Sequence, residues 1–460
     1  MRPIFSTEER EQGNGRTKQF FPCPLSLVIS LLILAFTCGD ALAAGKFFGV
    51  HYPPSSTGAL TLEVTYTLWI PDDAKQVRAV IVHQHGCGTA ANAAGETAAH
   101  DLHWQALATK WNAALLSPRY RQTEQGVADC APWMDPRNGS RAAFLKALGD
   151  LAEKSSHAEI AKVPWCLWGH SGGAYWVSLM QTLDPARIVA LWFRSGTAFP
   201  HWQNGGIEMP ALNDAVYQIP AMLNPGIKES TDERPIAAWL GSVAMFKAYR
   251  AKGAPIGFAA DPLSGHDCGD SRYLAIPFFD ACLRLRLPDQ DGATLRAVDL
   301  KQGWLAELMG REAVPLAQFN KAKSGAAVWL PDERVAKAWM EYVISGSVGD
   351  TTPPPAPTRV TVKVRPDGAS EITWEAAADF ESGLRGFIIE RDGKFLAQMP
   401  ADPVGKFGRA LFQTLSFHDA PEQPVPEMRF MDTTSKPGVK HDYRVISINS
   451  VGLKSPPGNS

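Results

Sequence analysis

The sequence predicts an α/β domain built on a mostly parallel sheet, followed by a smaller all-β domain. Strand and helix signals alternate along residues 47–288, which is typical of a parallel sheet flanked by helices. A proline-rich segment at residues 350–357, DTTPPPAP, then interrupts this pattern. Beyond it, short apolar runs alternate with period two between Gly, Pro and Asp turns, which indicates β-structure.

The composition is that of a folded, multidomain chain. It has 460 residues, 45% hydrophobic and 20% charged, with a formal net charge of -2 at pH 7. This length exceeds one ordinary domain, so we expect two or three. The charge balance provides no strong field for phosphate backbones, and no basic stripe interleaves with aromatic residues. We therefore expect no nucleic-acid partner.

The N-terminus predicts a signal peptide over residues 1–43. An apolar run at residues 25–36 follows Arg16 and Lys18, and Ala41-Leu42-Ala43 before Ala44 fits a cleavage site. The run is short for a membrane span, so an uncleaved anchor is the rival interpretation. We expect a secreted or periplasmic protein that begins near Ala44 and has no stable membrane insertion.

Cleavage of the predicted signal peptide would leave an odd number of cysteines, so at least one would be a free thiol or pair with another chain. Cleavage would remove two of the seven, leaving Cys87, Cys130, Cys166, Cys268 and Cys282. Cys166 and Cys282 lie in apolar patterns typical of buried positions, whereas the other three lie in predicted loops. We expect one disulfide among Cys87, Cys130 and Cys268, with the pair left open.

The α/β region divides into strand and helix segments in chain order. The first two strands read as an antiparallel pair, and the others as buried strands separated by helices. The expected strands are 47–52, 62–70, 77–83, 113–117, 163–167, 189–193, 221–223 and 256–260. The expected helices are 96–111, 140–154, 172–183, 235–252 and 271–285.

One junction between strand and helix carries the pattern Gly-x-Ser-x-Gly. The apolar run at 165–168 continues into Gly169-His170-Ser171-Gly172-Gly173. A sharp turn there would expose the Ser171 hydroxyl above the sheet, which is the geometry of a serine nucleophile. The chain has 39 glycines, so the pattern alone also fits a serine at a helix N-terminus.

With this elbow and the ordered elements around it, residues 44–288 resemble a catalytic domain of the α/β-hydrolase superfamily. The resemblance implies an eight-stranded, mostly parallel sheet and active residues in the chain order Ser, acid, His. It also implies two backbone N–H donors for an oxyanion: Gly172, after the nucleophile, and Cys87, in the His-Gly loop His83-Gln84-His85-Gly86-Cys87-Gly88. His83 and His85 could also suggest a metal, but no third ligand has usable spacing. We expect no metal and no cofactor.

The same resemblance places the base and the acid. His266 follows the last predicted strand, where the family has its general base. Glu229 stands three residues after Gly226 in the loop after the penultimate strand, where the family has its carboxylate. Asp232 and Glu233 are rivals, and all three acids could equally form a solvated charged loop.

The C-terminal part has three predicted segments. Residues 289–348 continue with helical spacing at 304–308 and 335–344, and read as a helical extension of the catalytic domain. Residues 349–357 form the linker. Residues 358–460 resemble a fibronectin type III domain through Trp374, Asp379 with Ser382-Gly383, and the runs 387–389 and 443–453.

Together with the predicted signal peptide, these resemblances imply a secreted serine esterase. Its broad relatives include dienelactone-hydrolase-like, acetyl xylan and feruloyl esterases, so we expect an ester substrate, on a polysaccharide or a related small ester. A prolyl-oligopeptidase-like peptidase is the alternative enzyme, although no propeller-like domain precedes the catalytic region. A catalytically inactive hydrolase fold that binds carbohydrate or another partner is the alternative of a different class.

Overall fold

The computed structural model describes residues 44–56, 60–89, 91, 98–122, 130–232, 236–290, 292–402 and 427–460. The predicted signal peptide at residues 1–43 lies outside these ranges. Among the residues described, no helix combines the length and the apolar character needed to cross a membrane.

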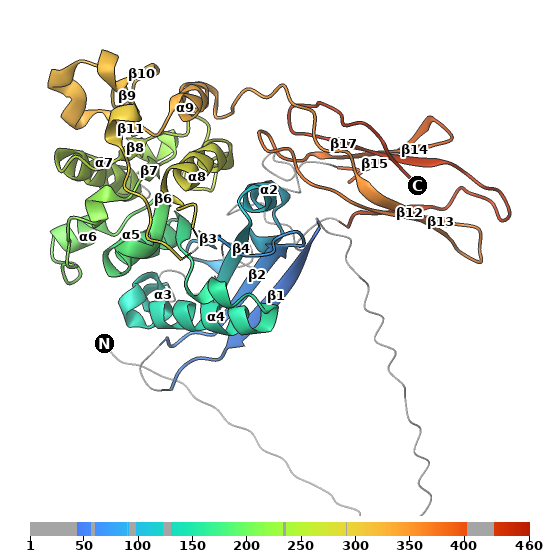
Figure 1. Ribbon diagram of the computed structural model, residues 1–460, viewed down its shortest axis with the longest axis horizontal. Helices are drawn as coiled ribbons and strands as arrows, with labels where there is room; N and C mark the ends of the chain where they lie inside the picture. The colour runs from blue at the N-terminus through green and yellow to red at the C-terminus, as the bar shows by residue number, and fades with distance from the viewer. Residues whose placement is uncertain are drawn as a thin grey trace, which may run out of the picture. The chain divides into compact units, whose positions relative to one another are not determined.

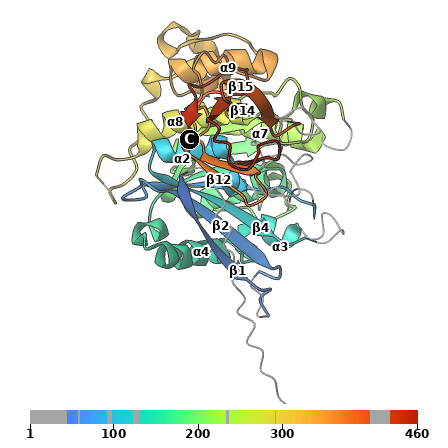
Figure 2. The same ribbon diagram turned by 90° about the vertical axis from the view of Figure 1, so that its right-hand side faces the viewer.

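The α/β domain is built on one eight-stranded sheet, in the order β1-β2-β4-β3-β5-β6-β7-β8. β1, β2 and β4 pair antiparallel, and the pairs from β4 through β3 to β8 are parallel. Figure 2 shows the antiparallel end of the sheet. The strands are β1 Gly45–Tyr52, β2 Val64–Pro71, β3 Ala79–Gln84, β4 Ala113–Tyr120, β5 Trp165–His170, β6 Ile188–Arg194, β7 Ala221–Asn224 and β8 Ile256–Phe258.

Helices cover both faces of this sheet (Figure 1). α2 and α8 lie on one face, and α4 and α5 lie on the other. The helices are α2 Leu102–Lys110, α3 Ala131–Met134, α4 Ser140–Ser155, α5 Gly172–Leu183, α6 Phe199–Gln203, α7 Ile236–Ala251 and α8 Arg272–Arg286. The predicted eight-stranded, mostly parallel sheet with flanking helices is therefore confirmed.

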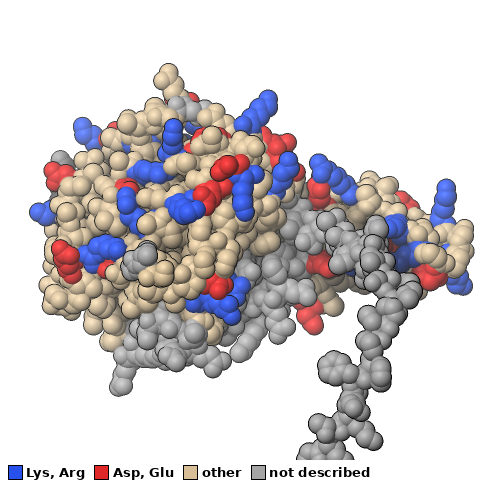
Figure 3. Space-filling model, turned by 90° about the horizontal axis from the view of Figure 1, so that it is seen from below, with Lys and Arg blue, Asp and Glu red and all other residues tan. Residues whose placement is uncertain are grey.

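The core lies where the central strands are covered from both sides. Every residue of β3, β5 and β6 is buried, which explains their nearly continuous apolar sequences. The helix expected at 96–111 begins later, because the Asp101 carboxylate accepts hydrogen bonds from the backbone N–H groups of His103 and Trp104 and caps α2. On the face drawn in Figure 3, side chains of both charge signs lie close together, in keeping with the small net charge.

The prediction that residues 289–348 form a helical extension is partly wrong. Residues 304–308 were expected to be helical, but the segment contains a three-stranded sheet, and only its end forms an α-helix. Trp304–Ala306 pairs antiparallel with a strand on each side, and an apolar run this short does not distinguish strand from helix. The elements are β9 Trp304–Ala306, β10 Ala313–Pro315, β11 Val328–Leu330 and α9 Glu333–Ser345.

The C-terminal domain is all-β, as predicted, and forms a sandwich of a three-stranded and a four-stranded sheet. Its core includes Trp374, whose ring packs edge-on against Phe387 with 5.0 Å between centroids. The first sheet contains β12 Thr358–Val364, β13 Ser370–Glu375 and β16 Arg429–Asp432, and the second β14 Gly386–Arg391, β15 Lys394–Met399, β17 Tyr443–Ile448 and β18 Gly458–Asn459. The predicted C-terminal all-β sandwich is therefore confirmed.

Candidate active site

Ser171 lies at the junction between β5 and α5. The strand ends at His170 and the helix begins at Gly172, so the chain reverses direction at Ser171 itself. Ser171 has φ 53° and ψ -115°, a positive-φ conformation that residues other than glycine rarely adopt. A strained turn of this kind holds a side chain in one fixed direction at the end of the sheet.

The glycines on either side of Ser171 allow the backbone to pack closely. A Cβ at Gly169 would collide with the backbone of Gly173, and a Cβ at Gly173 would lie 2.5 Å from the carbonyl oxygen of His85. Only glycine fits where backbone approaches backbone so closely. The Gly-x-Ser-x-Gly spacing therefore has a steric cause in this protein.

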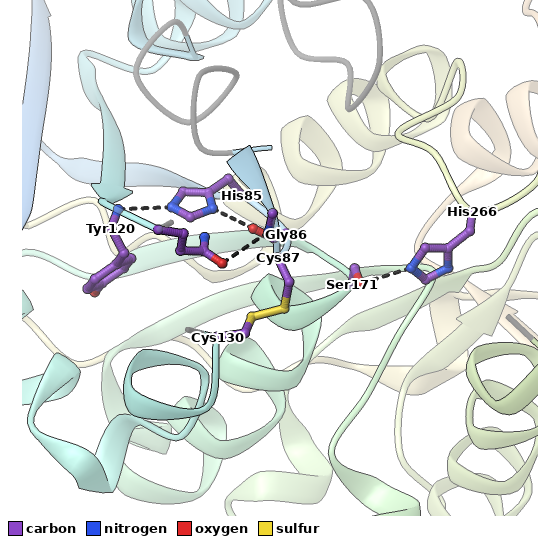
Figure 4. The surroundings of a disulfide bond; sticks show 9 residues. His85, Gly86, Cys87, Tyr120, Cys130, Ser171 and His266 are labelled. Atoms are coloured by element: carbon purple, nitrogen blue, oxygen red, sulfur yellow. Dashed lines mark hydrogen bonds between the residues drawn. A yellow bond between two sulfur atoms is a disulfide. The ribbon is translucent and has the colours of Figure 1, made fainter. Parts of the chain in front are cut away.

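The structure brings the three predicted side chains together. The Ser171 hydroxyl lies 2.9 Å from His266 Nε2, and His266 Nδ1 lies 2.5 Å from Glu229 Oε1. Figure 4 shows Ser171 and His266 facing each other. Glu229 is fully buried, whereas the His266 side chain is 34% exposed. The ring can therefore hydrogen-bond to a buried carboxylate on one side and to an accessible hydroxyl on the other.

The loops that carry the acid and the histidine are held together by backbone contacts. Glu229 lies in a short 3₁₀ turn after β7, where its second carboxylate oxygen accepts a hydrogen bond from the Gly226 N–H at 3.1 Å. The Ile227 N–H donates to the carbonyl of Asp261 at 2.8 Å. A Cβ on Gly226 would lie 2.6 Å from the carbonyl oxygen of Ser264, so glycine is required there too.

The rival acids do not share this environment. Asp232 is exposed and is not among the hydrogen-bond partners of the His266 ring. Glu233 lies outside the described residues. Of Glu229 and Asp232, the geometry therefore favours Glu229 as the partner of His266.

Arg194, at the end of β6, is a site residue that the sequence prediction missed. Its side chain is fully buried and donates to the Asp267 carbonyl at 2.7 Å, to the Gly265 carbonyl at 3.4 Å and to the Ser264 hydroxyl at 2.5 Å. These acceptors flank His266 on both sides, so Arg194 holds the loop that carries it. The sequence did contain a signal for this role, because Arg194 is the charged residue that ends an otherwise apolar strand.

The charge of Arg194 is balanced inside the protein. Its guanidinium lies 3.5 Å from the Asp261 carboxylate, and both groups are fully buried. Burial by itself lowers the pKa of Arg194, but the neighbouring negative charges, chiefly Asp261, outweigh it and raise the pKa above its usual value. Arg194 therefore stays charged and keeps its hydrogen bonds.

The predicted oxyanion loop follows β3 and lies against the nucleophile. A Cβ on Gly86 would lie 3.2 Å from Cβ of Ser171, so the segment that contains Cys87 passes directly beside the serine. Cys87 forms a disulfide with Cys130, with 5.5 Å between the Cα atoms. This bridge settles the pair that the sequence left open, and the third candidate, Cys268, is buried outside it.

The loop histidines are arranged as structural residues. The ring of His83 packs between Trp104 and Trp168, with centroid distances of 4.1 and 5.3 Å. His85 has hydrogen bonds at both ring nitrogens, to the Gly86 carbonyl and the Tyr120 N–H. Within the described ranges, the acidic group with metal-ligand spacing lies elsewhere, in the linker and the sandwich, and consists of Asp350, Asp379 and Glu381.

The aromatic residues of the surrounding loops mainly pack those loops down. Trp133, Phe199 and Trp202 are buried, and Trp133 stacks on Tyr120 at 4.9 Å. Aromatic side chains in such loops can either form an exposed platform for a substrate or pack the loops down. Their burial favours packing.

No protein-family model matches the sequence, and no curated protein matches it. Similar solved structures include an S-formylglutathione hydrolase from Agrobacterium tumefaciens, at 16% identity and a TM-score of 0.36, covering 52% of this chain and 94% of that one. Another is a ferulic acid esterase, at 14% identity and a TM-score of 0.34, covering 48% and 91%. A Fn3-like protein from Clostridium thermocellum has 16% identity and a TM-score of 0.16, covering 23% and 88%.

Proposed function

We propose that this protein, which combines an α/β-hydrolase fold with a fibronectin type III-like domain, is a carboxylic ester hydrolase that works through an acyl-enzyme on Ser171. One observation carries the proposal: an unbroken series of hydrogen bonds runs from the Ser171 hydroxyl through His266 to the buried Glu229 carboxylate. A serine hydroxyl is a weak nucleophile by itself, and an adjacent base that is oriented by a third group activates it.

In the acylation step, the Ser171 oxygen attacks the ester carbonyl while His266 Nε2 takes the hydroxyl proton. Glu229 accepts the Nδ1–H, which fixes the ring tautomer and stabilises the imidazolium that forms. When the tetrahedral intermediate collapses, the alcohol leaves and takes the proton from Nε2. The acyl group remains on the serine oxygen.

In the deacylation step, His266 Nε2 removes a proton from water, and the resulting oxygen nucleophile attacks the acyl carbonyl. Collapse of the second intermediate releases the carboxylic acid and returns the proton to Ser171. The partial exposure of His266 fits this step, because water can reach the ring from outside.

We assign the stabilisation of both intermediates to the backbone N–H groups of Gly172 and Cys87. Gly172 directly follows the nucleophile, and the loop of Cys87 lies against Ser171. Two donors that are fixed where negative charge develops stabilise that charge more strongly in a buried site than in water.

We further propose export and an ester substrate attached to a polysaccharide or a related small molecule. The disulfide Cys87–Cys130 supports an oxidising compartment, as the N-terminal apolar run does. The appended all-β domain supports a polymeric substrate, because such a module can act as a spacer or a binder. A panel of acetylated, feruloylated and methyl-esterified glycans tests the substrate class.

Hydrolysis of p-nitrophenyl acetate tests the reaction itself. We expect Ser171→Ala to lower kcat by about 10⁴-fold or more. Ser178→Ala is the matched control, because it removes buried hydrogen bonds in the same helix without touching the nucleophile. Equal rates for wild type and Ser171→Ala would instead favour an inactive binding protein, and cleavage of a prolyl p-nitroanilide without ester hydrolysis would favour a peptidase.

A further inference from the structure

The peptide that joins Gly86 to Cys87 lies between His85 and Ser171 (Figure 4). On one side, the Tyr120 N–H donates to His85 Nε2 at 3.0 Å. Since Nε2 accepts a hydrogen bond, Nδ1 carries the ring proton and donates it to the Gly86 carbonyl oxygen at 2.6 Å. The tautomer of His85 is therefore set by its backbone partners.

His85 keeps this role because it stays neutral. The ring is buried and lies 5.0 Å from the Trp133 ring. Burial lowers the pKa of His85 to about 4. The hydrogen bond to the Gly86 carbonyl raises the pKa, but by less than burial lowers it. Above that pH, the imidazole donates from Nδ1 and accepts at Nε2.

The hydrogen bond to Gly86 sets the direction of the next N–H group. The Gly86–Cys87 peptide is trans, so the Gly86 carbonyl and the Cys87 N–H point in opposite directions. The carbonyl points toward His85, and the N–H therefore points toward the side of the peptide where Ser171 lies. A fixed peptide here fixes an oxyanion donor.

The disulfide holds the same peptide through the Cys87 side chain. A Cβ on Gly172 would lie 2.8 Å from the Cys130 sulfur and closer still to the Cys87 sulfur, so the disulfide packs directly on the residue that supplies the other donor. Beyond Cys87, the Gly88 N–H donates to Gln122 Oε1 at 3.0 Å. Gln122 and Cys130, which both follow β4 in the chain, thus hold the oxyanion loop at two points.

We propose that His85 and Cys130 are positioning residues, which together fix the Cys87 N–H for the oxyanion and set kcat without touching the substrate. This inference rests on the proposed ester hydrolysis. It assigns a task to the disulfide beyond stability: the bond keeps the two oxyanion donors in register with each other. Without the disulfide, both N–H groups are still present, but the N–H of Cys87 is held less firmly in its position.

The test compares Cys130→Ala and Cys130→Ser in the full chain with wild type, using p-nitrophenyl acetate and a trifluoromethyl ketone that mimics the tetrahedral intermediate. Complete loss of an oxyanion donor costs about 10²–10³ in kcat, so we expect a loosened donor to cost about 10–100-fold. The KM should change little, whereas the affinity for the ketone should fall by the same factor as kcat. Cys282→Ala, which alters a buried thiol in α8, is the control for destabilisation alone.

A kcat and a ketone affinity within about twofold of wild type in folded Cys130 variants would overturn the inference. An equal loss of kcat in Cys282→Ala at the same fall in Tm would also overturn it, because the effect would then follow stability. If wild type turns over the ester no faster than Ser171→Ala, the proposed function itself fails. If wild type and the Cys130 variants are equally active, the proposed function stands and only the positioning role of the disulfide fails.

Discussion

Glu229 and Asp232 are acids three residues apart in one loop, and the fold gives them different surroundings. Glu229 is fully buried, and its two oxygens bond to the His266 ring and the Gly226 N–H. Asp232 is exposed to solvent. A buried carboxylate without partners is costly, so the two hydrogen bonds account for the burial of Glu229.

This difference predicts opposite outcomes for two conservative substitutions. Glu229→Gln keeps the size of the side chain but removes the charge that stabilises the His266 imidazolium, so we expect kcat to fall by about 10²–10⁴-fold. Asp232→Asn should leave kcat within about twofold, because the exposed side chain is screened by water. Steady-state ester hydrolysis by both variants checks this, and the reverse pattern would move the acid to Asp232.

At the scale of elements, the site is assembled by the ends of neighbouring parallel strands. β5, β6, β7 and β8 lie side by side in the sheet, so the segments that follow them meet at one edge. Ser171 follows β5, Arg194 ends β6, Glu229 follows β7 and His266 follows β8. Arg194 links these segments, because it reaches from its own strand to the histidine loop.

Arg194→Lys tests this link while keeping the charge opposite Asp261. A lysine cannot replace the several directed N–H donors of the guanidinium, so the carbonyls beside His266 lose partners. We expect a lower Tm and a kcat that is lower by about 10–100-fold, because small misplacements of a catalytic group are costly. Arg272→Lys is the matched control, since Arg272 is buried and pairs with Asp101.

In the control, we expect a comparable fall in Tm with kcat close to that of wild type. Circular dichroism melts and ester turnover measured on the same samples separate the two effects. If both variants lose activity in proportion to their loss of stability, Arg194 has only a structural role.

At the scale of the whole molecule, the residues of the candidate active site and the C-terminal sandwich occupy separate parts of the sequence. The candidate site residues all lie between His85 and His266, whereas the sandwich begins with β12 at Thr358. Asp350 of the linker accepts hydrogen bonds from Ser382 at 2.5 Å and Asn449 at 2.9 Å, which joins the linker to the sandwich. Within the sandwich, the buried Trp374 ring packs against Phe387.

Deletion of residues 350–460 should therefore leave small-ester hydrolysis intact. We expect kcat for p-nitrophenyl acetate within about threefold of wild type, because Ser171, His266 and Glu229 all precede the deleted segment. Sedimentation with insoluble polysaccharides measures polymer binding by the C-terminal sandwich. The full chain should bind one polymer that the truncated chain does not bind. Loss of small-ester turnover in a folded truncated chain would show that the module contributes to the catalytic domain.

Much of this architecture could be predicted from the sequence because it depends on local patterns. Buried strands such as β3 and β5 are apolar runs, and the glycines beside Ser171 mark a turn that only glycine permits. The run at residues 304–308 was predicted incorrectly as helical, because three apolar residues pair as a strand only when partner strands are present. Arg194 was missed for a similar reason, since its acceptors lie about 70 residues further along the chain.

By itself, the sequence determined the fold class and the elbow, because hydrophobic periodicity and close backbone packing act over a few neighbouring residues. Only the tertiary structure decided which cysteines pair, which acid meets His266 and how Arg194 and His85 are used. Each of these depends on distance and burial between segments that the sheet brings together. Burial then determines which charged and polar groups must find a partner, and in this molecule those partners surround Ser171.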